Sequence, residues 1–285
     1  MTGIKMSNSI DLVQALTLGV VQGLTEFLPI SSTAHLRVVP ALMHWQDPGA
    51  AFSAVIQLGS VAAVLAYFAR DIVSIATGAL AAFMRKDLAD KDFRLAGAIA
   101  VGTVPIVVIG LAIKGLLEAD DSPLRSFYVI GGAAIFMGIL LLVAERASKH
   151  QRDIEEINGK DGLLVGLGQA MALIPGCSRS GSTLTVAMLL NMKRADAARF
   201  SFLLGIPAIL ASGLLELKHM LEAGLARDQN SLLSLIAGLI SSFVVSYLSI
   251  AWLIKYLQTH ATWIFVGYRI IFGITIIALA ACKMI

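Results

Sequence analysis

Hydrophobic residues run through the chain in long blocks that short polar segments separate. Six blocks are long and apolar enough to cross a bilayer as helices, at about 20 residues each. They cover residues 51–69, 95–117, 127–144, 200–217, 232–254 and 263–282. A shorter block at 72–84 predicts a buried or interfacial helix. The pattern therefore predicts an all-α polytopic membrane protein with about six full transmembrane helices.

Two further regions, 11–45 and 163–192, are apolar at their flanks and polar at their centres. The centres run from Pro29 to His35 and from Pro175 to Thr183. Irregular polar backbone at membrane depth is tolerated only inside protein or beside a water-filled cavity. Both regions are therefore predicted to be re-entrant helical hairpins with a broken tip.

Composition agrees with a membrane protein and excludes other classes. Of 285 residues, 57% are apolar and 14% are charged, with a mean hydropathy of +0.81, whereas soluble domains carry about 25% charged residues. The net charge of +3 comes from scattered basic residues, so no nucleic-acid surface is expected. Two cysteines cannot make a disulfide framework. The first 14 residues lack the pattern of a cleavable signal, and we expect one integral membrane domain over 1–285.

The placement of lysine and arginine predicts an orientation. Loops 70–94 and 145–162 are rich in basic residues, whereas 118–126 holds only Arg125. The positive-inside rule places the two rich loops in the cytoplasm and 118–126 outside. Both chain ends then lie outside if the hairpins are re-entrant, and a hairpin that spans fully would reverse this.

The two polar-centred regions resemble each other at an offset of 146 to 148 residues. The matched positions are Gly19 and Gly166, Gln22 and Gln169, Pro29 and Pro175, Ser31 and Ser178, Thr33 and Ser180, and 50–53 and 198–201. The pattern predicts two inverted repeats, about 10–117 and 160–254, followed by a last helix at 263–282. Such repeats place a site near the midplane, where residues 22–35 and 178–183 would meet.

The first motif carries a carboxylate, a carboxamide, hydroxyls and an imidazole. Gln22 and Glu26 are four apart and share a helix face, and their oxygens suit Mg²⁺ or Ca²⁺. An intramembrane Glu26 is a functional candidate, although an arginine such as Arg269 would also satisfy it. His35 can shuttle protons, and a neighbouring hydroxyl would act as nucleophile or hold a phosphate oxygen.

The second motif has the composition of a phosphate cradle. Gly181 allows close backbone approach, the hydroxyls donate, and the following helix offers its N-terminus. Arg179 can bind phosphate with two donors, and its alternative role is a structural pair with Glu26. Cys177 is expected to be a packing residue. Together the two motifs suit attack on a phosphoanhydride better than transport, which needs no proton shuttle.

These motifs resemble those of a known family. Residues 22–35 (QGLTEFLPISSTAH) resemble the first signature of the undecaprenyl-diphosphatases of the bacitracin-resistance type, and 175–181 (PGCSRSG) resemble the second. The resemblance implies a phosphatase of the bacterial cytoplasmic membrane. It would convert undecaprenyl diphosphate to undecaprenyl phosphate, depend on a divalent metal and open to the outer face.

The resemblance also implies residue roles. Gln22 and Glu26 would hold the metal or position water, and Ser32 or His35 would be the nucleophile or base. The diphosphate would be bound by Ser31, Thr33, Ser178, Arg179, Ser180 and Thr183. We expect in-line attack on the terminal phosphorus, by Ser32 or by water that Glu26 or His35 activates. Ala34 and Gln22 depart from the family pattern, which more often has glycine and accepts glutamate there.

Three questions stay open from the sequence. A lipid flippase that binds the same diphosphate without hydrolysis is the alternative function. Arg269 is free to pair with Glu216, Glu26 or a lipid phosphate. The resemblance suggests a homodimer, for which Gly131, Gly132 and Gly138 would permit close helix packing.

Overall fold

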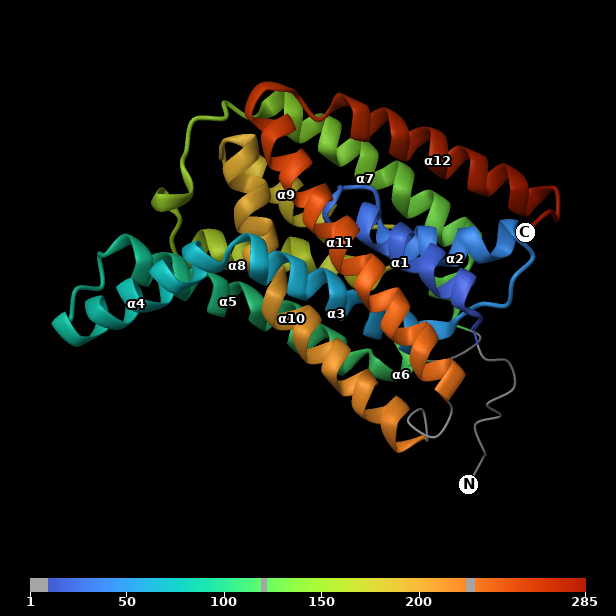
Figure 1. The fold of residues 1–285 in the computed structure, drawn as a ribbon. Coiled ribbons are helices and arrows are strands. Elements are labelled where there is room, and N and C mark those ends of the chain that lie inside the picture. The colour runs from blue at the N-terminus through green and yellow to red at the C-terminus, as the bar shows by residue number, and fades with distance from the viewer. Residues whose placement is uncertain (1–9, 119–121, 224–228) are drawn as a thin grey trace.

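The computed structural model describes residues 10–118, 122–223 and 229–285, and these segments are almost entirely helical (Figure 1). The helices are α1 Leu12–Phe27, α2 Ser32–Leu42, α3 Gly49–Tyr67, α4 Ala69–Arg85, α5 Lys91–Ala112, α6 Lys114–Glu118, α7 Phe127–Ala147, α8 Gly159–Ala170, α9 Arg179–Leu189, α10 Arg194–Glu222, α11 Gln229–Thr259 and α12 Trp263–Ala281. Short 3₁₀ turns lie at Pro123–Arg125, Ile154–Glu156 and Met171–Leu173.

Within the described residues, five helices are long and apolar enough to cross a membrane: α5, α7, α10, α11 and α12. A sixth span is formed if α3 and α4 are counted together, and these two meet at a bend of 71°. Many large apolar side chains are exposed on these helices, Val104 and Val108 of α5 among them, as a lipid-facing surface requires. The prediction of an all-α, multi-pass membrane protein is confirmed.

The predicted blocks at 72–84 and 95–117 both need a correction. The block at 72–84 forms most of α4, in which only Ala82 is buried, so the buried alternative for this helix is wrong. The block at 95–117 begins earlier, at Lys91, because Asp90 caps the helix by accepting from the amides of Asp92 and Phe93. It ends at Ala112, and α6 follows as a separate turn.

Both predicted polar centres fall at breaks between two short helices. In the first, α1 ends at Phe27 and α2 begins after Ser31; in the second, α9 begins after Ser178. Ser31 and Ser178 have φ angles of 78° and 65°, a left-handed region that only glycine adopts readily. Backbone held in such a conformation is typical of functional sites.

The first helix of each broken region packs closely on a distant long helix. Gly19 of α1 lies against the backbone of Gly238 in α11, and Gly166 of α8 lies against Gly102 in α5. A Cβ atom at either position would overlap the neighbouring backbone, so the small residues fix how near the helices approach. The two breaks are thereby held at fixed places in the bundle.

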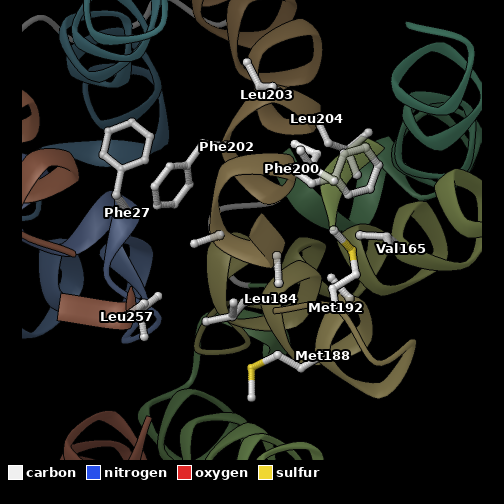
Figure 2. Packing of buried hydrophobic residues seen from close by; sticks show 14 of the residues in the cluster. Phe27, Val165, Leu184, Met188, Met192, Phe200, Phe202, Leu203, Leu204 and Leu257 are labelled. Carbon is white, nitrogen blue, oxygen red and sulfur yellow. The ribbon is translucent and has the colours of Figure 1, made fainter. Parts of the chain in front are cut away.

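The largest apolar cluster lies directly beside the first break. Figure 2 shows Phe27, the last residue of α1, facing Phe202 of α10, and their ring centroids are 4.9 Å apart at 75°. Leu184 and Met188 of α9 belong to the same cluster. The cluster therefore joins α1, α9 and α10, which are the helices that position the candidate site.

Candidate active site

Glu26 is the central acceptor of the candidate site. Its Oε2 accepts from Gln22 Nε2 at 2.8 Å and from Ser32 Oγ at 2.6 Å. Its Oε1 accepts from Arg179 Nη2 at 2.9 Å. The glutamate is 5% exposed, and its carboxylate accepts hydrogen bonds from all three of these donors. A base is thus in place beside a hydroxyl and an arginine.

The second motif touches the first through its hydroxyls as well. Ser180 Oγ donates to the carbonyl oxygens of Glu26 at 2.9 Å and Leu28 at 3.1 Å. Ser178 Oγ accepts from the amide of Gly181 at 3.0 Å and so caps α9. The structure therefore brings residues 22–32 and 178–181 together, although about 150 residues separate them along the chain.

Arg179 has one donor to spare. Its Nη2 binds Glu26, whereas its Nη1 is buried and has no hydrogen-bond partner among the described residues. Gly205 of α10 makes room for the guanidinium, because a Cβ atom there would overlap Nη1. The arginine can therefore bind an anion while it keeps its contact with Glu26.

Arg269 ties the two breaks together, a role that sequence reasoning left undecided. It is 1% exposed, and its Nη1 donates to the carbonyl of Pro29 at 2.9 Å. Its Nη2 donates to the carbonyls of Gly176 at 2.8 Å and Cys177 at 3.1 Å. These backbone acceptors, and neither Glu26 nor Glu216, are its partners in the described part of the chain. The sequence showed an arginine in the last apolar block but not that carbonyls would receive it.

His35 lies beside this cluster, and its ring nitrogens bind neither Glu26 nor Ser32 among the described residues. Its Nδ1 donates to the carbonyl of Ser31 at 2.7 Å, and its Nε2 lies 2.6 Å from the Tyr268 hydroxyl. The ring stacks on Phe272 with centroids 4.3 Å apart. Because a carbonyl only accepts, the imidazole carries a proton on Nδ1.

The remaining predicted hydroxyls take different places. Ser31 Oγ and Thr33 Oγ1 are 3.2 Å apart, and Thr33 is exposed. Thr183 is fully buried and donates to the carbonyl of Arg179 at 2.7 Å, and it also contacts the Ser201 hydroxyl. Thr183 therefore supports the packing of α9 on α10, while Thr33 is accessible to solvent.

Three serines that no motif indicated extend the network behind Glu26. Ser60 Oγ accepts from Gln22 Nε2 at 3.3 Å and from Ser246 Oγ at 2.8 Å, and lies 3.1 Å from Ser242 Oγ. These residues lie in otherwise apolar stretches of α3 and α11. Their role is visible only because the packing of α3 on α11 buries them together, so the sequence offered no signal.

The donor chemistry fits a divalent cation at one place. The described residues contain no cluster of three or more histidine, cysteine, aspartate or glutamate side chains that could hold a metal. Gln22 Oε1, however, is buried without a hydrogen-bond partner next to the Glu26 carboxylate. Two hard oxygen donors of this kind suit Mg²⁺ or Ca²⁺ when substrate oxygens complete the shell.

Comparison with known proteins identifies the family. The family model for bacitracin resistance protein BacA matches residues 15–275. The chain belongs to the BacA family. It is 54% identical over 271 residues to an undecaprenyl-diphosphatase of Synechococcus elongatus, covering 95% of this chain and 93% of the relative. It is 52% identical over 280 residues to one of Gloeobacter violaceus, covering 98% and 96%.

Membership of the BacA family confirms what the two motifs predicted. A further undecaprenyl-diphosphatase, from Trichormus variabilis, is 54% identical over 268 residues, which cover 94% of this chain and 83% of the relative. The match extends over all of the helices that carry the site, from Gln22 on α1 to Arg269 on α12. The similarity is therefore one of whole proteins rather than of two isolated motifs.

Proposed function

We propose that this protein hydrolyses undecaprenyl diphosphate to undecaprenyl phosphate and inorganic phosphate. The observation that carries the proposal is the contact of Glu26 with Ser32 and Arg179, a base, a hydroxyl and an anion-binding cation from both motifs. The names of the relatives, each an undecaprenyl-diphosphatase, agree with this chemistry. The reaction would recycle the lipid carrier of peptidoglycan synthesis and confer bacitracin resistance.

Ser32 is the nucleophile in our proposal. As its Oγ attacks the terminal phosphorus, its proton passes to the Glu26 carboxylate, which already accepts it at 2.6 Å. The bond between that phosphorus and the bridging oxygen breaks, and undecaprenyl phosphate leaves with the electron pair. Water then attacks the phosphorus of the phosphoserine, and the bond from phosphorus to Ser32 Oγ breaks. Glu26 returns its proton to Ser32 Oγ, and both hydrogens of the water leave on inorganic phosphate. In the alternative, Glu26 activates water directly and Ser32 only orients it. His35 would then hold the Ser31 carbonyl and Tyr268 rather than the reacting atoms.

The charge that develops on the phosphates is met by fixed positive groups. Among the described residues, Arg179 Nη1 has no hydrogen-bond partner, and the buried Arg269 donates to backbone carbonyls. Helices α2 and α9 both begin at the breaks, so their N-termini lie there. No side chain of the described residues caps α2. Such groups stabilise a phosphoryl transition state because they need no rearrangement.

A divalent cation, Mg²⁺ or Ca²⁺, fits this proposal. Glu26 and Gln22 Oε1 would hold it, together with phosphate oxygens. When bound, the ion would neutralise phosphate charge. Gln22 contributes no charge, so Glu26 would be the anionic ligand of the site.

We further propose that the chain consists of two inverted repeats, each with a re-entrant hairpin. At an offset of 147 residues, the α1 capping box of Asp11 and Gln14 corresponds to the α8 capping box of Asn158 and Asp161. The same offset relates the left-handed residues Ser31 to Ser178 and His44 to Asn191, and the end of α5 to the end of α11. The reciprocal packing of α1 on α11 and α8 on α5 is what an exchange between inverted halves requires.

We place the protein in the bacterial cytoplasmic membrane with its site open to the outer face. Ion pairs support this orientation. Lys91 pairs with Glu155, which joins the two loops that the positive-inside rule places in the cytoplasm, whereas Arg125 of the outer loop pairs with Asp47. In Figure 1, α12 ends on one side of the molecule and α4 lies on the opposite side.

A homodimer stays part of the proposal. Gly131 and Gly138 are occupied by packing on α12, however, so only Gly132 would be free for a second copy.

Phosphate release by the purified protein tests the function. Detergent-purified protein is given undecaprenyl diphosphate with Mg²⁺ or Ca²⁺, with excess chelator, and as the Arg179→Ala variant. We expect equal amounts of phosphate and undecaprenyl phosphate, no turnover with chelator, and at least a ~100-fold loss in the variant. Folded protein that binds the lipid tightly and releases no phosphate would contradict the proposal and favour a flippase.

A further inference from the structure

A cavity of about 190 Å³ lies beside the breaks, and its charged lining has no role in the chemistry above. Thr33 and Pro175, one from each motif, line it, as do Arg37, Asp47 and Arg125. Thr33 Oγ1 is 3.2 Å from Ser31 Oγ, and Ser32 follows Ser31 in the chain. The cavity therefore borders the proposed diphosphate site on the side of the loops that carry Asp47 and Arg125.

The charged residues of this cavity share one carboxylate between two arginines. Asp47 Oδ2 accepts from Arg125 Nη2 at 2.8 Å and also forms an ion pair with Arg37 Nη1. Its other oxygen accepts from the amide of Gly49 at 3.0 Å. The three side chains together carry one net positive charge, and each is partly exposed, at 24–31%.

Arg37 is held in place while one of its donors is left unused. Its guanidinium lies over the Phe127 ring, 5.6 Å from the centroid, which fixes its plane by a cation–π contact. Its Nε is buried and has no hydrogen-bond partner among the described residues. A buried donor on a cation costs free energy unless an acceptor reaches it, and an anion in the cavity would supply one.

We propose that Arg37 and Arg125 form a second phosphate-binding site, outside the site at Glu26 and Arg179. The proposal rests on the proposed function, since it assigns this cavity to a phosphate that enters or leaves that site. A phosphate carries more charge than a carboxylate and has three oxygens for two guanidinium forks. It therefore displaces Asp47, which acts as the competing counter-ion. The phosphate is either the terminal group of the lipid on its way in or the free product on its way out.

Kinetics of the full-length protein distinguish these two sources. Arg37→Gln and Arg125→Gln are compared with Arg85→Gln, which removes the same charge from an exposed residue elsewhere. If the lipid headgroup uses the site, KM rises about ten-fold with kcat kept; if free phosphate uses it, the Ki for product inhibition rises about ten-fold with KM kept. Asp47→Asn shifts the same constant in the opposite direction, which loss of a purely structural ion pair would not do.

Two results would overturn the proposal. One is that KM and Ki of both arginine variants equal those of Arg85→Gln. The other is that Asp47→Asn weakens phosphate binding as the arginine variants do. Arg125 lies on a short 3₁₀ turn, and the Arg125→Gln variant tests the proposal by itself if Arg37→Gln fails to fold. Equilibrium binding of inorganic phosphate to the wild type and to Arg125→Gln is also measured, without lipid. This measurement does not depend on turnover, so it tests the second phosphate site even if wild-type protein shows no turnover.

Discussion

At the scale of single residues, the site depends on where the Arg179 guanidinium lies. Its Nη2 binds Glu26, and its Nη1 has no hydrogen-bond partner in the part of the chain that the structure describes, so a small displacement would take Nη1 from the phosphate. Gly205 leaves the space that the guanidinium occupies, because a Cβ atom on this residue would overlap Nη1. The position of this charge is therefore fixed from α10 as well as from α9.

Replacing Gly205 by alanine is expected to move the guanidinium and lower kcat/KM about 100-fold, since misplacement of a catalytic group by ~1 Å has effects of that size. Steady-state phosphate release measures it. Gly97→Ala on α5 is the matched control, because a Cβ atom there has open space. Equal activity of the two variants would show that Arg179 does not need its observed position.

At the scale of helices, α12 holds the two breaks in register through Arg269. Four carbonyl contacts on a nearly inaccessible guanidinium join α7, the break after α1 and the break before α9. No other single residue described above touches both breaks through their backbone. We therefore expect α12 to stabilise the geometry of the site through Arg269, and to affect substrate binding only indirectly.

Arg269→Gln is expected to lower stability by about 3 kcal/mol and to abolish activity, because several buried carbonyls lose their donor at once. Thermal unfolding in detergent and phosphate release measure the two effects. Arg146→Gln removes an exposed arginine that lies over Trp263 and should change neither. Wild-type unfolding and turnover in Arg269→Gln would refute the role of Arg269.

At the scale of the whole molecule, the sequence was most informative where its signals are local. Apolar blocks of about 20 residues predicted the long helices, because the length of a span follows from bilayer thickness. The four-residue spacing of Gln22 and Glu26 predicted their shared face, and they are hydrogen-bonded. The family was predicted from two motifs and is confirmed over residues 15–275.

Features that depend on distant contacts could not be predicted in the same way. Ser60, Ser242 and Ser246 look like ordinary polar residues until α3 and α11 bring them behind Gln22. Arg269 was visible as a buried charge, but its acceptors are carbonyls that carry no sequence signal. The cluster of Arg37, Asp47 and Arg125 was likewise hidden, because it forms only when α2, the loop that holds Asp47 and the turn that holds Arg125 meet.

The central claim is that both halves of the molecule assemble one hydrolytic site around the Glu26 carboxylate. The most direct measurement is phosphate release from undecaprenyl diphosphate by Glu26→Gln, beside Glu216→Gln as a control outside the site. We predict that Glu26→Gln loses at least about 1,000-fold in kcat while it still binds the lipid, and that Glu216→Gln retains wild-type turnover. Turnover of Glu26→Gln within about ten-fold of wild type would contradict the account.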